Sequence, residues 1–427
     1  MEGNEMKKGV ALLLVLAMML SFCAVGASAE EQVTITFGFW GDTPEANMKM
    51  QLAENYMAMH PNVNIEFEYT DGNGYLTKMQ TWFSSGTTPD VFGVASDVLT
   101  YFINQDQFEN LAPYIEADGL TGSWNQNIID SSYTNAKGEV VAVPFISKVF
   151  AMAYNKDLFD EAGIAYPTDD WTVNDMLEAA RAITKGEGVD AVYGLRWGVR
   201  PTEFYRNLYG TPVYDLTTNE IHAADNEEFK AAVSLFVDTI KEGLAPNETG
   251  GALSTGGFEN GRFGMQLSAT WDIATLLTMA ESSFDWDIVM LPINTDFDKR
   301  MLSTFRGNGW CISKDAENKD VAWDFIKYMT TTEEAMRLAQ AFGIPELTSF
   351  AESEEYLTDF GDSTATYDKS VFLRMLDYTT NFSNMGVYAQ INDVIKNDYE
   401  LVLADQMTVD EMAEDVQMQA ESLMAMQ

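Results

Sequence analysis

The stretch VTITFGFW (Val33–Trp40) decides the fold of this chain, because it opens a strand–helix–strand unit. Its β-rich composition predicts a strand that ends at a Gly-Asp turn. A helix is predicted after Pro44, where apolar residues recur at helical spacing from Met48 to Met59. The run VNIEFEY (63–69) then alternates apolar and polar residues, as a half-buried strand does. Strand, helix and strand in this order form a βαβ unit, which is typical of a parallel sheet with right-handed crossovers.

The same pattern continues along the chain. A helix through residues 79–83 is followed by a Gly-Thr-Thr-Pro-Asp turn and a short apolar strand at 91–94. Amphipathic helices are predicted over 320–329 and 409–423, where apolar residues fall on one stripe. The chain contains no internal repeat and no Pro- or Ser-rich linker. Two α/β lobes joined directly by crossing strands fit this organisation.

Residues 1–29 read as an export signal. Lys7 and Lys8 precede an apolar run over 10–25, and the segment closes with Ala27-Ser28-Ala29, a small-x-small pattern for signal peptidase. The run is too short for a comfortable membrane span, so we predict a cleaved signal peptide. We therefore expect an extracytoplasmic protein, in the periplasm or at the cell surface.

A lipid anchor is the alternative to a soluble exported form. Leu20-Ser21-Phe22-Cys23 is similar to a bacterial lipoprotein signal, except that Phe22 is bulky where a small residue is expected. Cys23 would then carry the lipid and tie the protein to the membrane. We favour cleavage after Ala29, because the Ala27-Ser28-Ala29 site is intact.

Charge and cysteine content restrict the partners. The chain has 25 basic and 66 acidic residues, a net charge of −41, which disfavours nucleic acid and anionic lipid as partners. Removing the leader leaves 427 − 29 = 398 residues, enough for two domains. Cys311 would be the only cysteine of that mature chain, so no internal disulfide can form. We expect a monomer.

Catalytic motifs are missing from the sequence. The chain has only two histidines, His60 and His222, and it has neither nucleophile elbow, zinc-helix motif nor phosphate-binding loop. We therefore predict no enzyme activity, no cofactor and no metal site. An exported glycan hydrolase stays open as an alternative, because it needs only two carboxylates and 66 acidic residues are present.

Aromatic residues point to a sugar ligand. The chain has nine tryptophans and 18 tyrosines, several of them where loops or helix starts are predicted. The C–H face of a sugar ring stacks on an aromatic plane, while Asp, Asn, Arg and Lys bond its hydroxyls. Core packing is the competing explanation for each single tryptophan.

Six segments, in order, carry a resemblance to a known family. They are SGTTPDVF (85–92), VAVP (141–144), YNKDLF with AGI (154–164), FENGRFGM (258–265) leading to Trp271, ISK (312–314) and GIP (343–345). The chain resembles the extracellular solute-binding proteins of carbohydrate ABC importers, in the group that includes maltose-binding protein. Asn155 can cap the helix that follows it, and Gly163 can end that helix.

The resemblance implies a fold. It is an α/β, two-lobe periplasmic-binding-protein fold of type II, in which each lobe is a mostly parallel sheet flanked by helices and crossing hinge segments join the lobes. We predict lobe I over 30–145 and 292–337, and lobe II over 146–291 and 338–427. The crossings are expected near 143–148, near 288–292 and around Phe342.

Trp271 is the strongest candidate contact. It follows a predicted strand over 263–267, and ligands of open α/β sheets bind at the carboxyl ends of parallel strands. The family also places an aromatic residue there. Other positions follow from the resemblance, except that Lys148 stands where the maltose-binding relative has an acidic contact. The candidate ligand-binding residues are Trp40, Asp42, Asp97, Lys148, Trp197, Glu203, Tyr205, Trp271, Arg306, Asn308, Trp310 and Tyr388.

The resemblance also implies a function. The protein would capture a carbohydrate, such as an oligosaccharide, by hinge closure and deliver it to the membrane permease of an ABC importer. A sensor subunit that presents its closed complex to a membrane receptor is the second alternative. Neither the sugar nor the choice between importer and sensor follows from the sequence.

Overall fold

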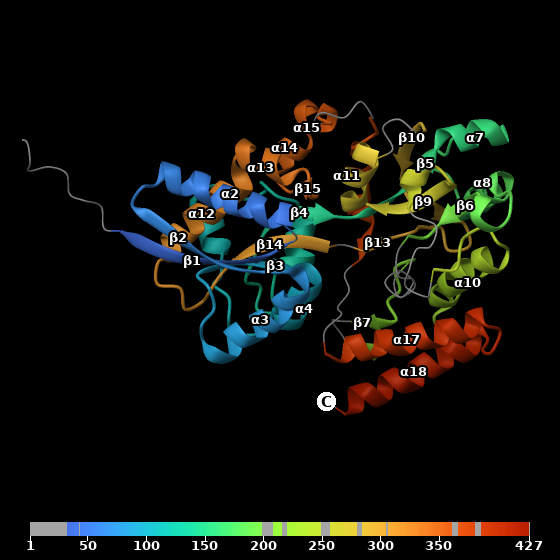
Figure 1. Cartoon of the computed structure of the whole chain (residues 1–427). Coiled ribbons are helices and arrows are strands. Elements are labelled where there is room, and N and C mark those ends of the chain that lie inside the picture. The colour runs from blue at the N-terminus through green and yellow to red at the C-terminus, as the bar shows by residue number, and fades with distance from the viewer. Residues whose placement is uncertain are drawn as a thin grey trace, which may run out of the picture.

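The computed structural model describes residues 32–41, 43–198, 208–215, 220–248, 257–279, 284–304, 306–360, 366–380 and 386–426. The predicted signal peptide and Cys23 lie outside this range. Within it, no helix is both long and apolar enough to cross a membrane. Figure 1 shows two groups of strands, one at each side of the molecule, with helices packed around both.

The first group is a six-stranded sheet with the order β15-β4-β14-β3-β1-β2. Its strands are β1 (Val33–Trp40), β2 (Val63–Thr70), β3 (Val91–Ala95), β4 (Val143–Lys148), β14 (Arg306–Ile312) and β15 (Ile344–Pro345). β1 is parallel to both β2 and β3, whereas β14 is antiparallel to β3 and β4, and β15 is antiparallel to β4. Strands β1 to β4 therefore share one direction, and their carboxyl ends meet at one edge.

The second group is a four-stranded sheet with the order β10-β5-β9-β6. Its strands are β5 (Phe150–Asn155), β6 (Tyr193–Arg196), β9 (Phe263–Ala269) and β10 (Trp286–Val289). β6 is parallel to β9, and β5 runs antiparallel to both β9 and β10. Only Val149 separates β4 from β5, so the chain passes directly from the first sheet to the second at this residue.

Helices cover both sheets. Those that follow the first strands are α2 (Thr43–Met59), α3 (Gly72–Ser85), α4 (Ser96–Phe102), α5 (Ala112–Ala117) and α6 (Gln126–Ile128). The middle of the chain contributes α7 (Lys156–Ala162), α8 (Val173–Ile183), α10 (Glu227–Lys241) and α11 (Thr270–Met279). The last third forms α12 (Lys319–Thr331), α13 (Glu333–Ala339), α14 (Thr348–Ala351), α15 (Glu354–Thr358), α16 (Ser370–Met375), α17 (Val387–Leu403) and α18 (Val409–Ala425).

Short elements complete the described chain. They are the π-helix Ile129–Tyr133, the 3-10 helices Gly188–Asp190, Phe258–Asn260 and Leu376–Tyr378, and the strands β7 (Tyr214–Asp215), β8 (Glu220–Ile221), β11 (Ile293–Asn294), β12 (Lys299–Arg300), β13 (Ser303–Thr304) and β16 (Thr379–Thr380). β13 pairs with β16 in parallel, close to where the chain returns from the second sheet to the first.

The local predictions are confirmed where they can be compared. The helix expected after Pro44 is α2, and the strand expected at 63–69 is β2. The Asn155 side chain accepts a hydrogen bond from the backbone N–H of Leu158 (3.1 Å), and Gly163 ends α7 in the left-handed conformation. Met59 is an exception, because its side chain is 54% exposed at the end of α2 instead of buried with the apolar face.

The hydrophobic core has two parts. One contains Phe37, Phe145 and Phe325 around one face of the six-stranded sheet, and the other extends from that sheet's second face to the four-stranded sheet. Leu347 and Phe350 belong to the first part. They lie in the region 338–427, which the prediction assigned to lobe II. The predicted boundaries themselves stay a prediction.

Candidate functional site

The register of the six-stranded sheet places four candidate residues at one edge. Lys148 is paired with Arg306, and Asn308 is paired with Ala95 at the end of β3. Trp40 ends β1, which runs parallel to β3. These positions therefore lie side by side along the carboxyl ends of β1, β3 and β4, the place where open α/β sheets bind ligands.

The Trp40 ring lies over Gly93 of β3. A Cβ atom at residue 93 would come within 2.9 Å of the Trp40 ring and within 2.9 Å of the Trp310 ring, so only glycine admits both indoles. The Tyr75 ring of α3 packs against Trp40, with 4.8 Å between the ring centroids. Its hydroxyl donates a hydrogen bond to the Gly93 carbonyl (2.7 Å). Trp40 is half-buried, so part of the indole stays open to solvent at the sheet edge.

A group of ionic and polar side chains adjoins Trp40, and we call Glu45, Lys49, Lys148 and Asn308 the edge cluster. The Glu45 carboxylate lies 3.0 Å from the Lys49 ammonium and 3.7 Å from that of Lys148. The Asn308 amide donates to the same carboxylate at 3.3 Å. Lys49 also donates to the Trp40 carbonyl (2.6 Å), and its ammonium is 4.4 Å from the Trp40 ring centroid.

Electrostatics keep Glu45 charged. Burial by itself would raise the pKa of this carboxyl, but the nearby charges of Lys49 and Lys148 outweigh it and hold the pKa below its ordinary value. The edge cluster therefore contains one carboxylate and two ammonium groups beside an aromatic surface. Such groups can accept and donate hydrogen bonds to a hydroxylated ligand, while the indole offers a stacking face.

The second sheet brings Trp271 to a corresponding place. β9 ends at Ala269, α11 begins at Thr270, and the Thr270 N–H donates to the carbonyl of Val149 at the crossing (3.1 Å). The predicted strand before Trp271 is thus β9, which continues to Ala269. The structure describes the backbone of Trp271, which lies in the first turn of α11 at the carboxyl end of its sheet.

Tyr388 lies in the first turn of α17, where its ring meets that of Tyr214 edge-on with 4.3 Å between centroids. It is half-buried. Asp97 is half-buried in the first turn of α4, directly after β3, and so lies near the same sheet edge as Asn308.

Two candidate tryptophans are packed inside the protein. Trp310 is 2% exposed, and its ring lies 5.0 Å from Phe37 and 5.4 Å from Phe145. Trp197 is 5% exposed; its ring stacks on Phe236 at 4.0 Å, and its N–H donates to the Thr239 hydroxyl (2.9 Å). These contacts give both rings a role in packing.

Three predicted residues, Asp42, Glu203 and Tyr205, lie outside the described residues, and Arg306 is described only by its backbone in β14. Sequence reasoning missed Glu45, Lys49 and Tyr75. Glu45 and Lys49 are four residues apart on α2, a spacing that usually marks an exposed helix pair. Only the neighbouring Trp40 hinted that the start of this helix faces the sheet edge.

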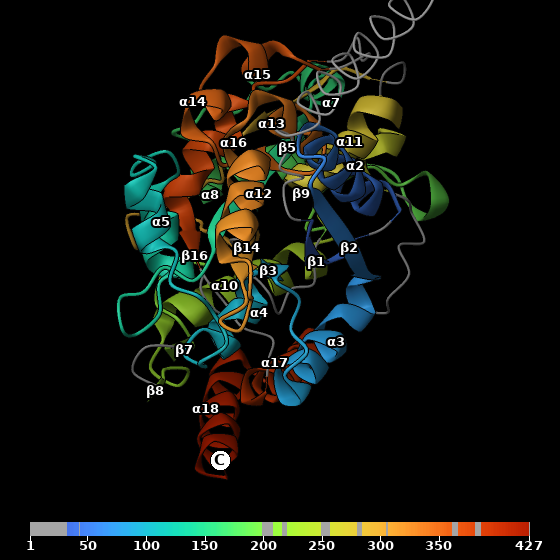
Figure 2. The same cartoon turned by 90° about the vertical axis from the view of Figure 1, so that its left-hand side faces the viewer.

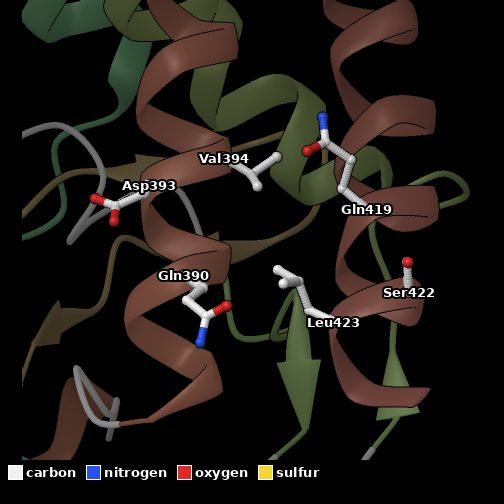
Figure 3. Close-up of a pocket in the computed structure, with 6 residues that line it drawn as sticks. All are labelled: Gln390, Asp393, Val394, Gln419, Ser422 and Leu423. Carbon is white, nitrogen blue, oxygen red and sulfur yellow. The ribbon is translucent and has the colours of Figure 1, made fainter. Parts of the chain in front are cut away.

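A separate pocket of about 270 Å³ lies between α17 and α18. Figure 3 shows that Val394 and Leu423 point into the space between these helices. Gln390, Asp393, Gln419 and Ser422 complete its lining, so it is formed by the two C-terminal helices and not by strand ends. We therefore place the candidate site at the sheet edges. Among the described residues, no cluster of three or more His, Cys, Asp or Glu side chains could hold a metal ion.

Comparison with known families assigns the chain. Residues 40–336 match the model of the bacterial extracellular solute-binding proteins, and this segment includes both sheet edges described above. The chain belongs to this family. The resemblance that the six sequence segments indicated is thereby confirmed.

Two named sugar-binding proteins are similar to the chain. The maltotriose-binding protein of Pyrococcus abyssi is 26% identical over 321 residues, which cover 74% of this chain and 67% of that protein. The lactose-binding protein of Rhizobium radiobacter is 22% identical over 334 residues, or 75% of each chain.

Solved structures of solute-binding proteins share the fold. An ABC substrate-binding protein from Listeria monocytogenes in complex with cycloalternan superposes with a TM-score of 0.75 at 23% identity, covering 92% of this chain and 100% of that one. The sugar-binding protein MalE from Xanthomonas citri gives a TM-score of 0.77 at 18% identity, with 92% and 98% covered. The two-lobe type II fold predicted from the sequence is confirmed. Its sheets are mixed and not mostly parallel as predicted, since two of the three strand pairs of the four-stranded sheet are antiparallel.

Proposed function

We propose that this solute-binding protein captures an oligosaccharide between its two lobes and delivers it to the permease of an ABC importer. The edge cluster beside Trp40 carries the proposal. It combines an aromatic face with a carboxylate, two ammonium groups and an amide at the carboxyl ends of β1, β3 and β4. The similar proteins named as maltotriose-binding and lactose-binding support the same ligand class.

The ligand would contact both lobes. Lobe I would contribute Trp40, Asp97 and the edge cluster, and lobe II would contribute Trp271 and Tyr388. Because the ligand would make its full set of contacts only when the lobes approach, it would stabilise the closed state by its higher affinity for that state. For Trp197 and Trp310 their core positions favour a packing role, while Asp42, Glu203, Tyr205 and Arg306 stay candidates on the resemblance.

The proposal extends to location and assembly. The protein would be exported through its cleaved leader, residues 1–29, act as an extracytoplasmic monomer and carry out no catalysis. N-terminal sequencing of the exported protein tests the first part: a mature chain beginning at Glu30 is expected, and a diacylated Cys23 would show the anchored form instead.

Ligand identification tests the function directly. The purified protein is incubated with a panel of malto-, manno- and galacto-oligosaccharides, and binding is read by native mass spectrometry and by the rise in melting temperature. At least one sugar of the panel is expected to bind, and its own mass should be unchanged after incubation. A sugar recovered as shorter products would show hydrolysis, and a panel without any binder would contradict the proposed ligand class.

Trp271→Ala tests the contact from lobe II. Loss of a stacking indole is expected to weaken binding of the identified sugar by about 2 kcal/mol or more, and Trp271→Phe should recover part of this. Calorimetric titration measures the affinity, and thermal melts of the same variants serve as the control for folding. Unaltered affinity in folded Trp271→Ala would remove this residue from the proposed site.

A further inference from the structure

Tyr101 and Gly386 bring the two lobes into contact at one point away from the crossing strands. Tyr101 lies on α4, which follows β3 of the six-stranded sheet, and Gly386 immediately precedes α17. Figures 1 and 2 both show α4 next to the beginning of α17. A Cβ atom at residue 386 would lie 3.0 Å from Cε2 of the Tyr101 ring.

Residue 386 must be glycine for two separate reasons. The first is space, because a Cβ atom there would also lie 3.7 Å from two further ring atoms of Tyr101. The second is conformation, since φ is +55° and ψ is −128° at this residue, a combination that side chains with a Cβ atom rarely adopt. The chain therefore has a backbone shape at the start of α17 that allows the aromatic ring to rest directly against it.

The Tyr101 side chain makes few other contacts. Its side chain is 44% exposed, and its ring meets Phe102 edge-on at 4.9 Å. Among the described residues, its hydroxyl has no hydrogen-bond partner. The contact with Gly386 is thus a ring against backbone, which can form and break without leaving a buried polar group unpaired.

We propose that Tyr101 and Gly386 form a latch that holds the two lobes together and positions the start of α17 at the ligand site. Gly386 is two residues from Tyr388, the candidate contact that packs on Tyr214. Closing the latch therefore fixes the segment that carries Tyr388 relative to lobe I. This inference rests on the proposed function, because the latch has a role only if a ligand binds between the lobes.

Interlobe distances in the ligand-free protein test the latch without any sugar. Spin labels are attached to Gln80→Cys on α3 and Ser422→Cys on α18, both exposed, in a Cys23→Ser background; the remaining Cys311 is buried. Tyr101→Ala and Gly386→Ala are each expected to shift the pulsed-EPR distance distribution to longer values. Tyr101→Phe keeps the ring and should match the wild-type distribution.

Gly243→Ala is the control for placing a Cβ atom at a positive φ. Gly243 also has a left-handed φ of +75°, but a Cβ atom there would meet no other atom within 4 Å. This variant should keep the wild-type distances even if it melts earlier. The latch would be overturned if the distance distribution of Tyr101→Ala equalled that of the wild type. It would also be overturned if the wild-type distribution were no shorter than that of Gly386→Ala.

Affinity gives the second readout. With maltotriose as probe, Tyr101→Ala and Gly386→Ala are expected to bind about fivefold more weakly than the wild type, because more of the binding energy is used to close the lobes. If the wild type does not bind maltotriose, that result counts against this sugar, and the ligand-free distances still decide whether the latch exists.

Discussion

Two buried carboxyl groups beside the six-stranded sheet have opposite environments. Glu45, at the sheet edge, faces two lysine ammonium groups and an asparagine amide. Glu346 follows β15 and accepts a hydrogen bond from the Ser147 hydroxyl of β4. Burial raises the pKa of Glu346 to about 7, and Ser147 offsets this only in part, whereas the pKa of Glu45 is held below its ordinary value.

The difference shows what a buried carboxyl group needs in order to remain charged. Both side chains are almost fully buried, so loss of hydration acts on both. Their pKa values differ because Glu45 has cationic neighbours and Glu346 has a hydroxyl donor. A hydroxyl donor stabilises a carboxylate much less than an ammonium group does. Glu45 thus keeps its charge at the sheet edge where a ligand is proposed to bind. Glu346 can gain or lose a proton beside the pairing of β4 with β15.

Removing the Lys49 ammonium group should have the largest effect on the free energy of unfolding. Lys49 is 1% exposed, and Lys49→Met leaves the buried Glu45 carboxylate with Lys148 as its remaining cation in the edge cluster. We expect the free energy of unfolding to fall by about 3–5 kcal/mol. Urea unfolding at pH 7 measures it, and the double variant Glu45→Gln/Lys49→Met should regain part of the loss. A Lys49→Met protein as stable as the wild type would refute the charge argument.

Replacing Glu346 by Gln should raise the free energy of unfolding, by an amount that depends on pH. The folded-state pKa of Glu346 is raised from 4.5 to about 7, so the folded protein holds this proton more tightly than the unfolded chain. The wild type should therefore lose stability as pH rises from about 4.5 through 7, by up to about 3 kcal/mol. Glu346→Gln lacks this loss.

Urea unfolding of both proteins at pH 5 and pH 8 gives the measurement for Glu346. The advantage of Glu346→Gln should be larger at pH 8 than at pH 5. The comparison between the two pH values cancels any constant effect of the amide. An advantage that is equal at both values would mean that Glu346 does not titrate in this range.

The smallest effect is expected at Ser147. Its hydroxyl donates to Glu346 and so favours the ionised form of this carboxyl. Ser147→Ala should destabilise the protein by about 1 kcal/mol at pH 8 and by less at pH 5, where the carboxyl is protonated. The same urea series measures it, with Ser84→Ala on the exposed end of α3 as a control that should show no pH dependence. A loss that is larger at pH 5 would reverse the assignment of donor and acceptor.

Local sequence patterns predicted the parts of the fold that depend on neighbouring residues. The strand–helix–strand unit over 33–69 and the Asn155 and Gly163 ends of α7 follow from periodicity and capping, which act within a few residues. The long-range pairing was harder. β14 lies between β3 and β4, and nothing in its own composition states that it returns from the second sheet and runs antiparallel to both.

The site was only partly predictable for a related reason. Trp40 and Trp310 both belong to strands of one sheet, yet Trp40 lies at the edge and Trp310 in the core. Their places depend on strand register, which involves residues far apart in the chain. Glu45 and Lys49 were missed because an acid and a base four residues apart usually indicate exposure. Here the helix turns this pair inward.

The position of β2 at the sheet margin has a consequence for solubility. Among the described residues this eight-residue strand pairs with β1 alone, so part of its outer edge lies open to another molecule, although the Ile65 N–H donates to the Met57 sulfur. Phe67 and Tyr69 are exposed beside it. Such margins are templates for aggregation unless charge keeps copies apart. The exposed Glu66 and a net charge of −41 supply that repulsion at neutral pH. Acidification below about pH 4 would neutralise it, and we expect the protein to self-associate there through β2 before it unfolds.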